Sequence, residues 1–226
     1  MRIVAISDTH GMHGRMLHPI PDGDVLIHCG DMTGHGTLPQ LSAVARWLGE
    51  QPHKYKIAVP GNHDAAAETD TGVIEMFFRE CNVLFLIDKA VTLDGVKFWG
   101  APWTPNFCNW HFMPRRNSPE MQAKWDLIPD DTQVLITHGP PHGILDEYIE
   151  PGYIEDAGQD HVGCELLRTR IRALHNLKVH LFGHIHEGYG RVRVSREAGD
   201  PLVEYVNAAI CNRNYKPWNR PQAVDL

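Results

Sequence analysis

Short apolar runs recur along the chain, and most of them stop at a cluster of polar residues. A run without alternating polar positions is typical of a strand that is covered on both faces. The runs that fit this description are therefore predicted to be buried strands: Arg2–Ser7, Val25–His28, Lys56–Val59, Val134–Ile136 and Val179–Phe182.

Apolar residues at helical spacing fall between several of these runs. The clearest helix is predicted over Leu38–Leu48, with further helices over Val73–Arg79 and Cys164–Leu174. Because strands and helices alternate near the start of the chain, βαβ units are expected there. Two hairpins are also predicted, one turning at Asp94-Gly95 and one joining Arg191–Val194 to Val203–Val206.

The whole pattern predicts an α/β fold in which two mixed β-sheets pack as a sandwich with helices outside. No repeat, linker or low-complexity tract divides the sequence, so one domain over residues 1–226 is expected. The segment Trp103–Pro129 departs from the pattern, because it is rich in Trp, Pro and Asn and lacks clear periodicity. Such a segment is typical of a functional loop or lid.

The composition narrows the function classes. With 21 Lys and Arg against 28 Asp and Glu, the formal net charge is −7. This charge argues against a protein that coats long nucleic acid, because such proteins carry a basic surface. The five cysteines form no CxxC pair, which indicates reduced thiols. No apolar run approaches the ~18 residues of a membrane span, and we expect a soluble, cytoplasmic protein without a membrane partner.

The 15 histidines are the unusual feature of the composition, and several of them follow predicted strands. The polar loops that end these strands read Asp8-Thr9-His10, Gly30-Asp31, Gly61-Asn62-His63-Asp64, Thr137-His138-Gly139 and Gly183-His184-Ile185-His186. Ligands gather beyond the carboxyl ends of strands in open sheets, so these loops are expected to converge.

Carboxylate and imidazole ligands together suit divalent ions such as Mn²⁺, Fe²⁺, Zn²⁺ or Ni²⁺. The loops offer seven candidate ligands, two Asp, one Asn and four His, which are too many for one tetrahedral ion and suit two ions that share a bridging carboxylate. Two ions about 3.5–4 Å apart can bind the attacking and leaving oxygens of a phosphoryl displacement. The nucleophile expected from this arrangement is a hydroxide that bridges the ions, because a bound divalent ion lowers the pKa of water to near 7.

This set of loops resembles the calcineurin-like metallophosphoesterase superfamily. A narrower resemblance, to metallophosphoesterase-domain phosphodiesterases, rests on Gly100–Pro105, Asn109-Trp110, Thr137–Pro141, Gly183–Gly190 and the tail with Val206-Asn207-Ala208, Pro217, Asn219 and Pro221. The resemblance implies a double β-sandwich flanked by helices, the metallophosphoesterase fold, with the metals at the strand ends.

The resemblance also implies a role for each loop residue. The first metal is assigned to Asp8, His10 and His186, the second to Asn62, His138 and His184, and Asp31 bridges the two. His63 is not a ligand in this pattern; it points at the substrate phosphate, stabilises the transition-state charge and is a candidate general acid. Asp64 follows His63 and is a candidate to orient it. Mn²⁺ is the expected metal, with Fe²⁺, Ni²⁺, Zn²⁺ and Mg²⁺ as alternatives.

The function these features predict is a dinuclear metal-dependent phosphodiesterase that hydrolyses small phosphodiesters, with cyclic nucleotides as one class. Met32–Gly36 lacks the acidic residue and the arginine that the protein serine/threonine phosphatases carry after Gly-Asp, which counts against a phosphoprotein phosphatase. Two alternatives stay open: a nucleotide phosphomonoesterase, and a metal-bearing scaffold that binds a nucleotide or protein with negligible turnover.

His142, Trp103 and Trp110 are candidate substrate-binding residues, the tryptophans as stacking faces. The oligomeric state is left open.

Overall fold

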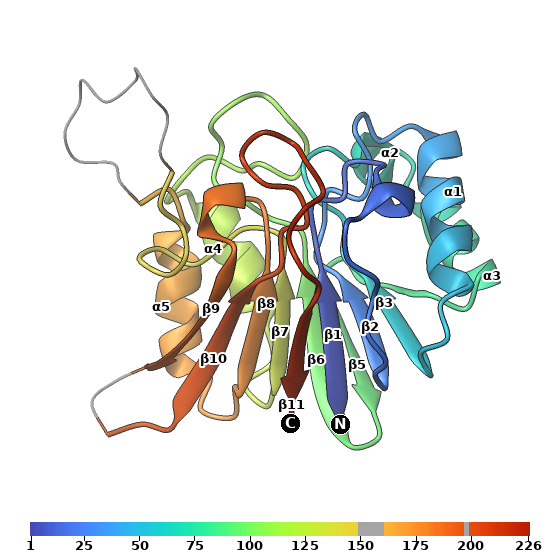
Figure 1. Ribbon diagram of the computed structural model, residues 1–226. Helices are drawn as coiled ribbons and strands as arrows, with labels where there is room; N and C mark the ends of the chain where they lie inside the picture. Colours follow the sequence, from blue (N-terminus) through green and yellow to red (C-terminus); the bar gives the residue numbers. More distant parts are fainter. Residues whose placement is uncertain (149–160, 197–198) are drawn as a thin grey trace.

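The computed structural model describes residues 1–148, 161–196 and 199–226, and it contains two β-sheets packed face to face (Figure 1). The first sheet has the order β11-β1-β2-β3-β4. Its strands are β1 (Arg2–Ile6), β2 (Val25–His28), β3 (Tyr55–Ala58), β4 (Leu84–Phe85) and β11 (Gln222–Asp225). Strands β1 to β4 are parallel to one another, and β11 is antiparallel to β1 at the edge.

The second sheet has the order β5-β6-β7-β8-β10-β9. Its strands are β5 (Lys89–Leu93), β6 (Val96–Ala101), β7 (Val134–Thr137), β8 (Val179–Phe182), β9 (Gly190–Ser195) and β10 (Leu202–Asn207). The four central strands are parallel, and the edge strands β5 and β9 pair antiparallel with β6 and β10 as the two predicted hairpins require. The predicted sandwich of two mixed sheets is therefore confirmed.

Both faces of each sheet are covered, which explains why the strands are continuously apolar. In β1, Ile3 and Ala5 belong to the layer between the sheets, together with Val134 and Ile136 of β7. The alternate residues of β1 lie in a second apolar layer beneath the helices of the first sheet. Burial on two sides removes the need for alternating polar positions in the central strands.

Helices cover the outer faces of the sandwich (Figure 1). The first sheet carries α1 (Leu38–Gly49), α2 (Ala65–Thr69) and α3 (Thr71–Glu80), and the second carries α4 (Pro119–Asp126) and α5 (Glu165–Ala173). The short 3₁₀ helices are His13–Arg15 and His186–Gly188. Helix α1 begins at a capping box between Thr37 and Gln40 and buries the apolar face predicted from its spacing. Among the described residues, none of the helices has the length and apolar character needed to cross a membrane.

The segment Trp103–Pro129 is only partly the loop that its composition predicted. It contains α4, which begins at Pro119 after Ser118 accepts a hydrogen bond from the Met121 backbone N–H. The Trp125 side chain is fully buried, and its indole N–H donates to Cys164 Sγ at 3.2 Å. The helix spans only two turns, which is too short for its periodicity to stand out in the sequence.

Candidate metal centre

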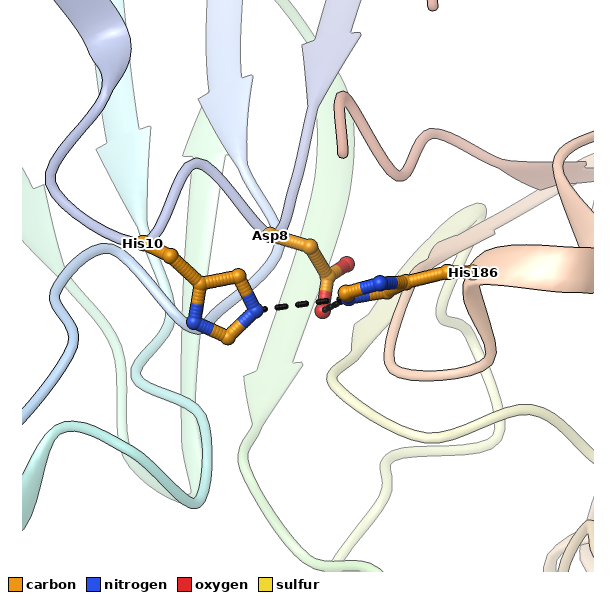
Figure 2. A group of neighbouring side chains, drawn as sticks. All are labelled: Asp8, His10 and His186. Atoms are coloured by element: carbon orange, nitrogen blue, oxygen red, sulfur yellow. Dashed lines mark hydrogen bonds and ion pairs between the residues drawn. The ribbon is translucent and has the colours of Figure 1, made fainter. Parts of the chain in front are cut away.

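The loops that follow β1, β2, β3, β7 and β8 converge at one end of the sandwich, as predicted from their positions after parallel strands. Three overlapping groups of side chains bring their donor atoms within 4.8 Å of one another. The groups are Asp8, His10 and His186 (Figure 2); His10, Asp31 and His63; and Asp31, His138 and His184. The structure therefore gathers residues from both sheets into a single site.

Several of these residues have left-handed backbone conformations. The φ angles are 52° at Asp8, 44° at His10, 51° at Asp31 and 67° at His184. Non-glycine residues persist in this region only where the surrounding structure holds them. At Gly61 the chain needs glycine for a different reason, because a Cβ atom there would lie 2.3 Å from the Asp31 backbone nitrogen. The ligand loops are thus packed backbone against backbone in strained conformations.

Asp31 divides the site into two halves, because it lies between the donor group that contains His10 and the donor group that contains His138. Its Oδ2 atom is 3.8 Å from His10 Nε2, and its Oδ1 atom is 3.3 Å from His138 Nε2. On one side, His186 Nε2 lies 3.4 Å from Asp8 Oδ1 and 3.3 Å from His10 Nε2. One carboxylate thus presents a separate oxygen to each half, which is the placement that a bridging ligand requires.

The second half of the site is completed by an amide. Asn62 Oδ1 lies 3.0 Å from His138 Nε2, and the His184 ring lies beside the His138 ring with 4.9 Å between centroids. These three residues are the ones that the family resemblance assigns to the second metal.

Hydrogen bonds to backbone carbonyls fix the orientation of three imidazole rings. The Nδ1–H groups of His138, His186 and His63 donate to the carbonyl oxygens of Cys29, Asn212 and Gly34 at 3.0, 3.1 and 3.0 Å. A ring that donates from Nδ1 presents Nε2 to the site. Metal-binding histidines are commonly held in this way by a partner behind the ring.

The charge at the site favours bound cations. Burial alone would raise the pKa of the Asp31 carboxyl, but the neighbouring histidines, His138 foremost, hold the pKa well below its usual range. Burial also opposes protonation of His138, yet the Asp31 carboxylate raises the pKa of that ring to about 9. Burial would likewise raise the pKa of the Asp8 carboxyl, but its hydrogen bond with His186 holds that pKa well below its usual range.

The positive charge drawn onto these imidazoles balances the two buried carboxylates, and a bound cation could replace it once the rings are neutral. The donor set consists of imidazole nitrogens, carboxylate oxygens and one amide oxygen, and it fits divalent transition ions. The residues that would hold a first ion are Asp8, His10, Asp31 and His186, and those that would hold a second are Asp31, Asn62, His138 and His184.

His63 borders this set of residues. Its backbone N–H donates to Asp31 Oδ1 at 2.8 Å, which fixes the chain beside the centre. Its ring Nε2 is 4.0 Å from Asp31 Oδ2, and its side chain is 17% exposed. The ring of Trp110 lies against it at a centroid distance of 4.1 Å with 34° between the planes. His63 is therefore placed where its Nε2 atom can reach a molecule bound at the centre.

Asp64 has a different place from the one its position after His63 suggested. Its carboxylate accepts hydrogen bonds from the backbone N–H groups of Gly61, Met32 and Thr33, and from the Thr33 hydroxyl. These bonds join the loop after β2 to the loop after β3. Asp64 thus holds the two loops in register, and its oxygens are occupied by groups other than the His63 ring.

The candidate substrate-binding residues divide into two sets. Trp110 is at the centre, against His63. The Trp103 indole N–H instead donates to Asp88 at 2.7 Å, and Lys124 lies 3.9 Å above its ring. His142 lies beside His161, with 5.5 Å between ring centroids. The structure thus brings Trp110, but neither of the other two, into contact with the histidines of the centre.

Tyr215 is a residue of the site that the sequence did not indicate. Its ring lies 5.0 Å from both the His10 and the His186 rings, and the residue is 53% exposed. It belongs to a turn organised by Asn212, whose side-chain oxygen accepts from the backbone N–H groups of Asn214 and Lys216. No local motif marks this tyrosine, because the turn reaches the centre from a distant part of the chain.

Comparison with known proteins agrees with this geometry. The calcineurin-like phosphoesterase family model matches residues 1–188. The chain belongs to this family. It is 37% identical over 250 residues to the human metallophosphoesterase domain-containing protein 1, covering 100% of this chain and 71% of the relative. The mouse protein of the same name matches equally well. The predicted superfamily is thus confirmed, and with it a metallophosphoesterase-type hydrolase.

Two more distant matches are informative in different ways. A Nostoc protein described as a 3′,5′-cyclic-nucleotide phosphodiesterase is 21% identical over 182 residues, covering 76% of this chain and 59% of the relative. The crystal structure of TT1561 from Thermus thermophilus superposes with a TM-score of 0.57 at 16% identity, covering 91% of this chain and 88% of the other. The structural match supports the fold alone.

Proposed function

We propose that this protein is a dinuclear metal-dependent phosphodiesterase that hydrolyses small phosphodiesters, including cyclic nucleotides. The observation that carries the proposal is the position of Asp31, whose two oxygens face His10 on one side and His138 on the other. A single carboxylate between two donor clusters is the arrangement that two ions sharing one ligand need. Two divalent ions, with Mn²⁺ favoured, would neutralise phosphate oxygens and supply a hydroxide nucleophile at neutral pH.

The chain supplies the proton for the leaving oxygen through His63. Because Nδ1–H of this ring donates to the Gly34 carbonyl, Nε2 is the atom that gives up a proton to the substrate. The ring donates from its imidazolium form and returns to the neutral tautomer that keeps the bond to Gly34. The Asp31 carboxylate lies 4.0 Å from Nε2.

Three exposed aromatic residues surround the histidines, and we call them the aromatic rim: Phe107, Trp110 and Tyr215. Phe107 is 5.5 Å from His184 between ring centroids, and the other two contact His63, His10 and His186. A flat exposed ring can stack against a nucleobase, which stabilises binding by about 1–3 kcal/mol per base. The Nostoc phosphodiesterase relative supports the same substrate class.

The rim takes over the stacking role predicted for the two tryptophans. Trp110 keeps that role in the proposal, whereas the Trp103 side chain contacts Asp88 and Lys124. His142, whose ring lies beside that of His161, remains a proposed substrate contact.

A substrate panel tests the proposal. The purified chain, stripped of metal and reloaded with Mn²⁺, Ni²⁺, Fe²⁺ or Mg²⁺ in turn, is assayed on 2′,3′- and 3′,5′-cyclic nucleotides, bis(p-nitrophenyl) phosphate and nucleotide monoesters. We expect diesters to be hydrolysed faster than monoesters, with Mn²⁺ among the most active metals. Faster monoester hydrolysis would indicate a phosphomonoesterase, and nucleotide binding without any product would indicate a scaffold.

A further inference from the structure

Each sheet carries one fully buried histidine that is not part of the ligand set. His28 is the last residue of β2, and His180 lies in β8. Their neighbours Ile27 and Leu181 belong to the apolar layer between the sheets. Since side chains alternate along a strand, the two histidines point away from that layer, each toward the helix-covered face of its own sheet.

The two histidines make the same contact. His28 Nε2 lies 2.9 Å from the Thr9 hydroxyl, and His180 Nε2 lies 2.8 Å from the Thr137 hydroxyl. Thr9 stands between the ligand residues Asp8 and His10, and Thr137 directly precedes His138. The two sheets thus place an imidazole from a neighbouring strand behind a threonine that adjoins a metal ligand.

The hydroxyl protons determine which ring nitrogen is protonated. The Thr9 hydroxyl donates to the Met32 carbonyl at 3.2 Å, and the Thr137 hydroxyl donates to the Gly139 carbonyl at 2.6 Å. A hydroxyl has one proton, so toward the imidazole each oxygen accepts, and Nε2 carries the hydrogen. The Nδ1 atom of each ring is then an unprotonated acceptor, and neither Nδ1 has a partner among the described residues.

A buried acceptor without a partner destabilises a folded protein. If packing alone determined these two positions, an apolar ring of similar shape would serve better there. What an apolar ring cannot supply is the Nε2–H bond to the threonine. The bond to threonine therefore accounts for a histidine at each position, and the unpaired Nδ1 atom lowers the stability of the fold.

Thr9 lies in a strained part of the chain. Asp8 and His10 on either side of Thr9 both have left-handed φ angles, a conformation that surrounding contacts must hold. The chain of bonds from His28 through Thr9 to Met32 ties the loop after β1 to the loop that carries Asp31. Backbone bonds from His10 to Asp31 and from Gly11 to Met32 join the same loops, and the side-chain bonds fix the segment between them.

We propose that His28 and His180 are positioning residues that hold the ligand loops in the metal-binding conformation, at the expense of the stability of the metal-free fold. The inference rests on the proposed metal centre and assigns these two residues a role outside the ligand set. It predicts that replacing either histidine weakens metal binding without lowering the stability of the metal-free protein. A histidine with only a packing role would not give this result.

The test compares His28→Phe and His180→Phe with the wild-type chain. Mn²⁺ binding is measured by isothermal titration calorimetry, and thermal unfolding is measured on the metal-free protein. We expect each variant to bind Mn²⁺ roughly 10- to 100-fold more weakly, the range seen when a partner behind a ligand is removed. The metal-free melting temperature should be unchanged or raised. His28→Gln, which retains an N–H donor, should recover most of the lost affinity.

His53 provides a matched control. It is also buried and also has an Nδ1 atom without a partner among the described residues, but its Nε2 atom lies 3.0 Å from the Pro21 carbonyl, which belongs to no ligand loop. His53→Phe should therefore bind Mn²⁺ as the wild type does. Where a histidine variant does not fold, Thr137→Val makes the same test, because it removes the hydroxyl and keeps the side-chain shape.

Three results would contradict the inference. Wild-type Mn²⁺ affinity in both phenylalanine variants, or an equal loss in His53→Phe, would show that the threonine bonds do not act on the centre. A metal-free melting temperature that falls in step with affinity would show a packing role only. Absence of Mn²⁺ binding by the wild-type chain would instead overturn the proposed function, and the inference with it.

Discussion

The five-stranded and six-stranded sheets contribute different chemistry to the centre. The first sheet supplies both carboxylates, Asp8 and Asp31, with the Asn62 amide and one imidazole, whereas the second supplies three imidazoles. In the proposed centre the attraction for cations therefore originates on the first sheet, and the second would complete the coordination with ligands that are neutral when they bind metal. Asp8 also joins the halves, because its carboxylate accepts the His184 backbone N–H at 2.9 Å.

The same comparison extends behind the ligands. The first sheet holds more strained ligand residues, with Asp8, His10 and Asp31 in left-handed conformations against His184 alone on the second. Yet both sheets have a buried histidine bonded to a threonine beside a ligand. The two halves thus differ in charge and strain but share a histidine–threonine contact behind a ligand loop.

Removing the shared carboxylate should have the largest effect. Asp31→Ala deletes the ligand between the two halves, and we expect turnover of bis(p-nitrophenyl) phosphate with Mn²⁺ to fall by at least about a thousandfold, to background. Asn62→Ala should abolish turnover as well. Asp131→Ala is the control, because that side chain is 64% exposed in a surface ion pair with Lys97. Unchanged activity in purified Asp31→Ala would rule out the bridging assignment.

His63→Ala should reduce kcat while leaving the metals in place. Loss of a general acid lowers the rate by roughly 10²- to 10⁴-fold, and the metal content should stay near that of the wild-type chain. Metal analysis of the same sample separates the two roles open to His63. If the variant loses metal, His63 is a ligand and the assignment of the acid is wrong.

Tyr215→Ala tests the aromatic rim rather than the proposed metal ligands. We expect KM for cyclic nucleotides to rise roughly tenfold with little change in kcat, since stacking acts on binding of the base. A dialkyl phosphodiester without a planar group should show no change. Trp218→Ala is the matched control, because Trp218 is 56% exposed and, among the described residues, has no ring contact with the histidines of the centre. Equal KM changes in both variants would remove the rim from substrate binding.

The acid sensitivity of the metal-free fold should depend on His180. Burial, with a smaller contribution from Arg168, lowers the pKa of this ring to about 3, whereas an unfolded histidine titrates near 6.5. Between these values the unfolded chain binds a proton that the folded chain does not, so stability is lost as pH falls. By pH 5 the loss attributable to His180 is about 2 kcal/mol.

His180→Phe should therefore lose about 2 kcal/mol less stability than the wild-type chain between pH 7 and pH 5. Urea unfolding of both metal-free proteins at the two pH values measures the difference. Equal losses would show that the ring is already able to take up a proton in the folded protein.

Much of the centre could be predicted from sequence because its ligands follow apolar strands in short motifs. Gly61-Asn62-His63-Asp64 and Gly183-His184-Ile185-His186 are local patterns, and parallel strands bring their ends together. Tyr215 could not be predicted, because it reaches the centre from a turn that only the folded tail places there. Helix α4 was missed because two turns carry too little periodicity.

Other predictions concern contacts that spacing does not determine. Asp64 adjoins His63 in sequence, yet its oxygens bond to the loop after β2. His28 and His180 lie in no recognisable motif. Their proposed role depends on contacts with threonine hydroxyls from neighbouring strands, which the sequence does not reveal. The extent of the domain over residues 1–226, the metal and the cytoplasmic location stay predictions.

Stoichiometric reconstitution tests the central claim most directly. Mn²⁺ is added to the metal-free chain in steps, and bound metal and turnover of bis(p-nitrophenyl) phosphate are measured at each step. Activity should rise until two ions are bound per chain and then stay constant. Full activity with one bound ion, or hydrolysis that is independent of added metal, would contradict the dinuclear centre.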